Sequence, residues 1–367
     1  MTIYIILLLA VFLYSLILRT RPNNKYVKII FLFLSFFSFT LVLGLRSNNV
    51  GEDTPTYMNI FYFCQSIPLD RILTLHSLKI PYFTQLGYTN TIEIGFFIWC
   101  KFIGILTNSA QFFLFCTAGI TCFLFAKFIY DNCSDDVFLP TMVFLCESPF
   151  MNSFNLVREM MACAIALQAY QLLKNNKIVK ASLVLVIAFL IHNTAIITFL
   201  LILFHFTFKN VNKRHDFNIA AFVAILIPIV TIVAQSSITK IFPEYSDYYI
   251  HNFYQNSLGI GSLILIIIEI IGIIYMHIRK FKITDSAEIS ALVLLGIAFQ
   301  FLGTKIVMLF RLAIYFRAYL LLFFNRLFEY VPTSYKKLYR NIVIVLLIIY
   351  YLSFASSDSR SYEFFWN

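Results

Sequence analysis

Twelve long apolar runs recur along the chain. The hydrocarbon core of a bilayer needs about 20 helical residues, and somewhat shorter helices are tolerated where the bilayer thins or polar flanks reach the interface. Only 13% of the residues are charged, against about a quarter in soluble domains. We therefore predict an all-α, polytopic integral membrane protein, with about twelve transmembrane helices in a single transmembrane domain over residues 1–367. The runs lie at 2–18, 29–45, 110–130, 137–150, 156–173, 179–191, 194–208, 217–236, 259–278, 287–303, 306–324 and 341–354.

Three further features of the sequence limit its class. The run 2–18 has no basic leader and no small-residue cleavage site after it, so we interpret it as a first span rather than a signal peptide. The seven cysteines form no Cys-x-x-Cys pair, so neither a metal site nor a disulfide framework is predicted. Lys and Arg exceed Asp and Glu by ten, which in a membrane protein reports topology rather than a nucleic-acid partner.

The basic residues predict an orientation. Short loops that are rich in Lys and Arg stay in the cytoplasm, and such clusters lie at residues 19–28, 174–180, 209–214, 279–282 and 326–340. All five clusters lie on the cytoplasmic side only if the short run 92–106, with Lys101 at its centre, does not cross the membrane and instead begins and ends on the same side of it. We therefore expect a re-entrant or interfacial helix there, both termini outside, and external loops at 46–91 and 237–258.

Unusual polar residues collect on this expected external face. Arg46 ends the second run and is followed by Asp53 and Tyr57 in a turn-like segment. Arg158 opens the run 156–173, on the side where the positive-inside bias disfavours a cation. The plainest interpretation of Arg46 is a snorkelling arginine before a turn. Arg158 is either a snorkelling anchor or a guanidinium fork suited to phosphate oxygens.

Two further apolar runs carry ionisable residues. His192 interrupts a nearly continuous apolar stretch and is predicted to lie in a tight external hairpin, as a packing residue or as an acid/base group. Arg311 and Arg317 lie about 9 and 18 Å into the run 306–324 and point in different directions. Arg311 shares a helix face with Tyr315. Because an arginine in lipid costs about 3 kcal/mol or more, we expect a polar cavity or a partner for Arg311.

Glu93 and Asp53 are the candidate partners of Arg311. Three or four arginines, one histidine and a few carboxylates on one side of a membrane suit a pyrophosphate-bearing lipid, with His192 as the acid/base group.

The order and spacing of these motifs resemble the EpsG-like branch of the Wzy-type polysaccharide repeat-unit polymerases, over nearly the whole chain. The terminal segment "SYEFFW" is similar to that of the family, and Glu159 stands where the family pattern has glutamine. Arg317 is an addition to the pattern. The matching segments are Arg46 with "GEDTPTY" at 51–57, "EIGF" at 93–96, "REMMA" at 158–162, "AFLIHNTA" at 188–195 and "RLAIYF" at 311–316.

This resemblance implies a function. The protein would be a metal-independent glycosyltransferase of the GT-C type in the bacterial cytoplasmic (inner) membrane, without a cofactor. Its donor and acceptor would be glycans linked to undecaprenyl pyrophosphate, and a chain-length regulator protein is a further expected partner.

Most of the site residues follow from the same resemblance, and Arg317 is added to them as a further candidate from outside the pattern. His192 or Asp53 would take the acceptor proton. The pyrophosphate would be bound by arginines, and other polar residues would support them. These groups are Arg158, Arg311, Arg46 and Arg317 for the pyrophosphate, and Tyr57, Glu93 and Tyr315 for support.

Two other functions fit parts of the sequence. An O-antigen ligase-like glycosyltransferase would use similar arginines and a histidine, but ligases tend to have a larger late external loop than 237–258. A flippase or transporter of lipid-linked oligosaccharides also fits twelve spans. Transporters often show internal repeats between their halves, and none is visible here.

Overall fold

The computed structural model describes residues 2–21, 24–68, 79–83, 89–133, 135–208, 213–233, 258–283, 285–304, 307–357 and 362–366. Within these ranges the chain forms sixteen α-helices, one 3₁₀ helix and one two-stranded sheet. The helices are α1 (Thr2–Thr20), α2 (Lys25–Gly44), α3 (Thr54–Ser66), α4 (Ile94–Leu106), α5 (Ala110–Asn132), α6 (Phe138–Cys146), α7 (Ser148–Asn155), α8 (Val157–Lys174), α9 (Ile178–Ile191), η2 (Asn193–Phe199), α10 (Leu200–Thr207), α11 (Lys213–Val233), α14 (Ile260–Ile278), α15 (Ser286–Gly303), α16 (Val307–Arg317), α17 (Leu320–Tyr330) and α18 (Thr333–Ser357).

Every predicted apolar run contains a helix. Among the residues that the structure describes, five helices are long and apolar enough to cross a membrane, namely α1, α2, α5, α14 and α15. The fold is therefore all-α apart from one small sheet, and its multiple long apolar helices are those of a multi-pass membrane protein. The count of twelve spans and the external position of the termini stay predictions.

Three of the predicted runs are interrupted rather than continuous. The run 137–150 divides into α6 and α7, because Glu147 accepts a hydrogen bond from Ser148 N at 2.6 Å and Pro149 occupies the first turn of the new helix. The run 306–324 divides between α16 and α17, and the run 194–208 begins with the 3₁₀ turns of η2.

The predicted external loop 46–91 contains regular structure that the sequence did not reveal. It holds α3 and an antiparallel hairpin of β1 (Lys79–Phe83) and β2 (Thr89–Glu93), with Lys79 paired to Glu93. The helix α4 follows directly; its 13 residues span about 20 Å, less than the roughly 30 Å of a bilayer core. Residues 237–257 of the second predicted loop lie outside the described residues.

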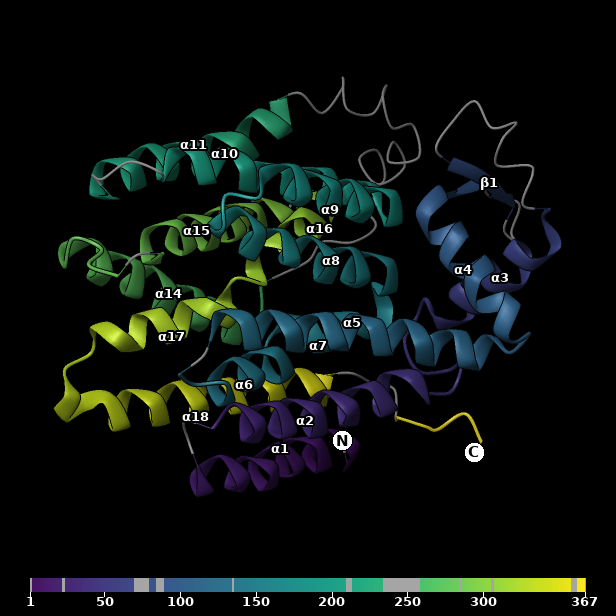
Figure 1. Ribbon diagram of the computed structural model, residues 1–367, viewed down its shortest axis with the longest axis horizontal. Coiled ribbons are helices and arrows are strands. Elements are labelled where there is room, and N and C mark those ends of the chain that lie inside the picture. Colours follow the sequence, from purple (N-terminus) through teal and green to yellow (C-terminus); the bar gives the residue numbers. More distant parts are fainter. Residues whose placement is uncertain are drawn as a thin grey trace.

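Most helices lie with their axes along the long axis of the molecule, whereas α3, α4 and the hairpin gather at one end (Figure 1). Within the bundle α8 packs against both α5 and α9, and α15 packs against α16 and α11. Residues 362–366 lie against the end of α2, where Ser47 N donates to Glu363 O at 2.9 Å and Phe365 N donates to Leu45 O at 3.0 Å. The same end of the bundle therefore carries α3, α4, β1 and the last described residues.

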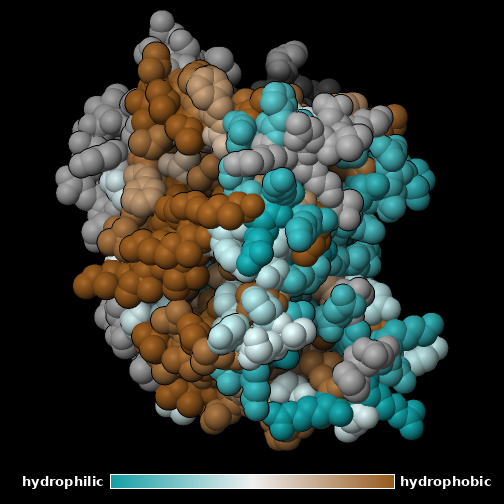
Figure 2. Space-filling model, turned by 90° about the vertical axis from the view of Figure 1, so that its left-hand side faces the viewer, coloured by the Kyte–Doolittle hydropathy of each residue, from teal (hydrophilic) through white to brown (hydrophobic). Residues whose placement is uncertain are grey.

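The outer helices expose apolar side chains. Leu9 and Leu13 of α1 are 62% and 63% exposed, and α14 and α18 expose isoleucines in the same way. Seen from the end opposite to α3 and α4, the molecule has a hydrophilic region beside a broad hydrophobic surface (Figure 2). Such a surface is expected of helices that face lipid rather than water.

Candidate functional site

Five charged or ionisable side chains from four parts of the chain form one continuous set of contacts. We call this set the charge cluster; its members, in order of contact, are Arg158, Glu93, His192, Glu159 and Arg311. Glu93 ends β2, Arg158 and Glu159 open α8, His192 follows α9, and Arg311 lies in α16. Each carboxylate thus lies between two groups that carry or accept positive charge.

Glu93 occupies the first carboxylate position of the cluster. Its Oε2 lies 2.6 Å from Arg158 Nη1, its Oε1 lies 2.7 Å from His192 Nδ1, and Asn193 N donates to Oε1 at 3.3 Å. The side chain is almost fully buried. Burial alone would raise the pKa of Glu93, but the positive charges of Arg158 and His192 lower it to about 2.

A glycine permits this close approach of α4 to α9. A Cβ atom on Gly95 would come within 2.6 Å of the Leu190 carbonyl oxygen, closer than atoms of this kind pack. The two backbones are therefore in direct contact two residues from both Glu93 and His192. This contact accounts for the glycine in the "EIGF" segment at residues 93–96.

His192 lies in the extended turn between α9 and η2, with both ring nitrogens facing carboxylates. Nδ1 lies 2.7 Å from Glu93 Oε1 and Nε2 lies 3.3 Å from Glu159 Oε1, although neither contact has the alignment of a hydrogen bond. Burial by itself lowers the pKa of His192, but the carboxylates of Glu159 and Glu93 outweigh it and raise the pKa above its usual value. The protonated, positively charged ring is therefore favoured.

Glu159 connects His192 to Arg311. Arg311 Nη1 donates to Glu159 Oε1 at 2.8 Å, and the glutamate side chain is buried. Because successive residues of a helix point in different directions, Glu159 lies opposite Arg311 and not opposite its neighbour Arg158. One turn further along α16, Tyr315 shares a 2.9 Å hydrogen bond with the hydroxyl of Thr194, which attaches α16 to η2.

Arg158 is held by oxygen atoms and by aromatic rings. Besides Glu93, Nη1 donates to Thr91 O at 3.3 Å. The guanidinium carbon lies 5.9 Å from the ring centre of Tyr57 and 5.8 Å from that of Phe96, within the range of cation–π attraction. Its Nε is buried and has no hydrogen-bond partner among the described residues.

Asp53 lies beside the charge cluster at the N-terminus of α3. The preceding turn requires Gly51, whose φ of +85° is rarely adopted by other residues. The Asp53 side chain makes no capping hydrogen bond. Burial and the nearby Glu159 carboxylate raise the pKa of Asp53 above its usual value, while Arg311 and Arg158 oppose that rise. Asp53 is thus close enough for the charges of the cluster to change its pKa.

Most of the predicted site residues lie in one region, namely Arg158, Arg311, His192, Glu93, Asp53, Tyr57 and Tyr315. Arg46 differs from them, because its side chain forms hydrogen bonds with other parts of the protein. Arg46 is 2% exposed. It donates to Thr54 Oγ1 at 2.9 Å, to Phe154 O at 3.2 Å and to Leu43 O. These contacts tie the end of α2 to α3 and α7. Arg46 therefore supports the turn that carries Asp53.

Arg317 lies in a separate buried cluster. It forms two hydrogen bonds with Glu269 of α14, one of them at 2.9 Å, and a third with Glu147 Oε1 at 3.1 Å. All three side chains are buried. Arg317 follows Arg311 by six residues on α16. Because each residue of a helix is rotated by about 100° from the one before it, the two arginines leave the helix in different directions and meet different partners.

Three buried carboxylates that pair with arginines are not among the site residues predicted from the sequence. Glu159 was noticed only as a departure from the family pattern, and its contact with Arg311 depends on the packing of α8 against α16. Glu147 and Glu269 are single charges in apolar runs, a signal that points to a buried cationic partner. Within the described ranges, no group of three or more His, Cys, Asp or Glu side chains is placed to hold a metal ion.

The EpsG family matches residues 29–367, a range that includes the whole charge cluster and Asp53. The chain belongs to the EpsG family. This family is linked to exopolysaccharide biosynthesis, so the family-level resemblance predicted from the motifs is confirmed. No curated protein and no solved structure gave a significant match.

Proposed function

We propose that this EpsG-family protein is a polymerase that joins undecaprenyl-pyrophosphate-linked oligosaccharide repeat units into a surface polysaccharide. The observation that carries the proposal is the charge cluster, in which Arg158 and Arg311 are fixed around His192 with Asp53 alongside. On the topology predicted from the basic loops, this end of the bundle faces the periplasm, where lipid-linked repeat units are polymerised in the Wzy-type scheme.

The two arginines have the chemistry to bind the donor pyrophosphate. A guanidinium presents several N–H donors in a plane and matches phosphate oxygens. Arg158 and Arg311 are already oriented by Glu93 and Glu159, so little reorganisation is needed as negative charge develops on the leaving pyrophosphate. Tyr57 supports Arg158 from one side, at 5.9 Å.

Asp53 is the better base of the two candidates. With carboxylates on both sides of its ring, His192 has a raised pKa, which favours its protonated form and a role as a cationic positioning group. The Asp53 carboxylate has a raised pKa and therefore a greater affinity for a proton. An acceptor hydroxyl loses its proton to Asp53 as its oxygen bonds to the anomeric carbon. The bond from that carbon to the pyrophosphate oxygen breaks, with inversion of configuration.

The reaction in this form requires only the two lipid-linked glycans. Donor and acceptor both reach the site from the membrane, the undecaprenyl pyrophosphate of the donor is released, and the product glycan stays on the acceptor lipid. No nucleotide sugar enters these steps. A chain-length regulator is the proposed protein partner.

The test is glycan chain length in a strain that lacks this gene and carries either the wild-type protein or a variant. We expect Asp53→Asn to leave acceptors with a single repeat, and Arg158→Lys to reduce polymer about tenfold or more because lysine lacks the planar fork. Matched controls are Asp131→Asn, at a partly exposed aspartate, and Arg279→Lys, at an exposed arginine, both at the far end of the bundle.

Two outcomes decide against the proposal. Full-length polymer with Asp53→Asn, at normal protein abundance, would remove the proposed base. Loss of single-repeat products as well as polymer in the deletion strain would indicate transport of lipid-linked oligosaccharides instead of polymerisation.

A further inference from the structure

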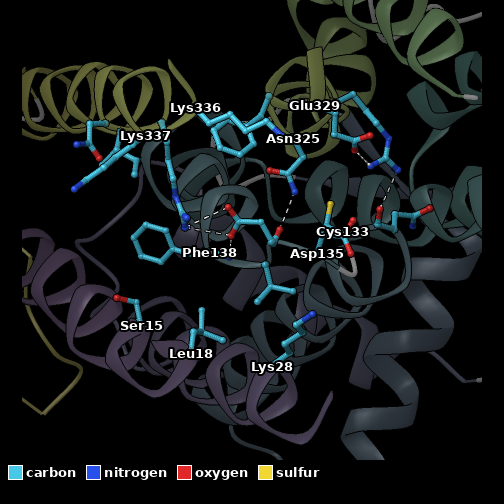
Figure 3. Close-up of a pocket in the computed structure, with 18 of the residues that line it drawn as sticks. Ser15, Leu18, Lys28, Cys133, Asp135, Phe138, Asn325, Glu329, Lys336 and Lys337 are labelled. Carbon is cyan, nitrogen blue, oxygen red and sulfur yellow. Dashed lines mark hydrogen bonds and ion pairs between the residues drawn. The ribbon is translucent and has the colours of Figure 1, made fainter. Parts of the chain in front are cut away.

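A second polar site lies at the end of the bundle opposite to the charge cluster. It is a cavity of about 970 Å³ between α1, α6, α17 and α18. Figure 3 shows Lys336 and Lys337 of α18 on one side of this cavity and Ser15 and Leu18 of α1 on the other. The basic loops predict that this end faces the cytoplasm.

The wall of the cavity has an excess of positive charge. Seven basic and four acidic side chains line it, and three of the acidic ones are engaged by cations. Asp285 contacts both Lys174 and Arg326, Glu329 contacts Arg326, and Asp136 contacts Arg340. These pairs leave a surplus of positive charge within the wall.

Three of the basic residues supply that surplus. Arg19, Lys336 and Lys337 form no ion pair with any residue that the structure describes. Arg19 and Lys337 are exposed, and the ammonium group of Lys336 lies 5.5 Å from the ring centre of Phe328. The cavity therefore attracts an anion and has cations to bind it.

The cavity also has an apolar part and an unused hydrogen-bond acceptor. Phe12, Leu18 and Phe138 contribute to the wall. Asn132 is buried, its Nδ2 donates to Phe128 O at 2.9 Å, and its Oδ1 has no partner among the described residues. Asn132 itself is one of the residues that line the cavity.

The helices beside the cavity face lipid. Leu16 of α1 and Leu338 and Ile342 of α18 are about half exposed, and they lie within about two turns of the unpaired cations. Basic side chains at the ends of lipid-facing helices attract the anionic headgroups of the cytoplasmic leaflet. A ligand with an anionic head and apolar chains fits both surfaces at once.

We infer that this cavity binds the headgroup of an anionic phospholipid, with the phosphate between Arg19, Lys336 and Lys337. The acyl chains lie along the exposed apolar faces of α1 and α18. The site is independent of glycosyl transfer at the other end of the bundle.

The test uses the purified full-length protein in neutral detergent and measures bound lipid by native mass spectrometry. The probes are phosphatidylglycerol, phosphatidylcholine and soluble glycerol phosphate. We expect phosphatidylglycerol to bind about tenfold more tightly than phosphatidylcholine, with the preference weakening in high salt. Lys336→Glu with Lys337→Glu should abolish this preference, whereas the exposed control pair Lys177→Glu with Lys180→Glu should retain it.

A second variant, Arg19→Gln with Lys337→Gln, changes two exposed residues and tests the same site if the charge reversal impairs folding. Retention of the full preference in both cavity variants would overturn the assignment, as would equal binding of the two phospholipids. Equally tight binding of glycerol phosphate would identify a site for free phosphate esters and would overturn the lipid assignment.

Discussion

Replacement of Glu93 by glutamine tests whether the charge cluster organises this end of the protein. The substitution keeps the size of the side chain but removes the negative charge shared by Arg158 and His192. The pKa of Glu93 is about 2, against 4.5 for an ordinary glutamate. Since one pKa unit corresponds to about 1.4 kcal/mol, the surroundings favour the ionised over the neutral side chain by about 3 kcal/mol.

We therefore expect Glu93→Gln to lower the free energy of unfolding by about 3 kcal/mol and the unfolding temperature by roughly 6 °C or more. The measurement is thermal unfolding of the purified protein in detergent, followed by intrinsic fluorescence. Glu329→Gln is the matched control, because Glu329 also pairs with an arginine but its side chain is 40% exposed. An exposed pair of this kind contributes about 1 kcal/mol or less.

The same substitution changes how stability depends on pH. The folded-state pKa of Glu93 lies below its unfolded value, so the unfolded chain takes up the proton first as the pH falls. The stabilisation is present above about pH 4.5 and is lost as the pH falls towards 2. Glu93→Gln should flatten the stability curve in that window. Unfolding temperatures within 1–2 °C (roughly 0.5 kcal/mol) of the wild type across this range would refute the reasoning.

Two further substitutions separate packing from ligand binding. Gly95→Ala places a methyl group within 2.6 Å of Leu190 O, so polymer length should fall. Gly119→Ala is the control, because its methyl group meets its nearest neighbour at 3.6 Å, and polymer length should stay as in the wild type. Arg317→Met leaves two buried carboxylates without their cation and should destabilise the protein by about 3–5 kcal/mol, unlike Arg279→Met at an exposed site. Glycan chain length in the complemented deletion strain measures the first effect, and thermal unfolding of the purified protein measures the second. A stable but inactive Arg317→Met protein would instead support a pyrophosphate contact.

Much of the helical architecture could be predicted from hydrophobic runs alone, because a bilayer requires each spanning segment to satisfy its own backbone hydrogen bonds. The interruptions could not. The break between α6 and α7 depends on the Glu147 carboxylate, which caps α7 and also reaches Arg317. The hairpin of β1 and β2 could not be predicted from the sequence, because its strands are short and lie within a polar loop.

The members of the site were largely predictable, but their contacts were not. Motif order and topology identified Arg158, His192 and Arg311, since each is a charge where apolar residues dominate. The expected partner of Arg311 was Glu93 or Asp53, whereas its partner is Glu159. Sequence spacing fixes which way a side chain leaves its own helix, but the partner depends on how α16 packs against α8.

This chain has Glu159 where the family pattern has glutamine, and the contacts of Glu159 give this difference a chemical consequence. A glutamine facing Arg311 and His192 would also present an amide oxygen to Arg311, but it would add no negative charge beside the imidazole. The Glu159 carboxylate, 3.3 Å from His192 Nε2, joins Glu93 in raising the pKa of that ring. In this chain the cationic form of His192 is therefore favoured, which makes the ring a poorer candidate for the base that takes the acceptor proton. Asp53, beside the cluster and ahead of α3, is the better candidate.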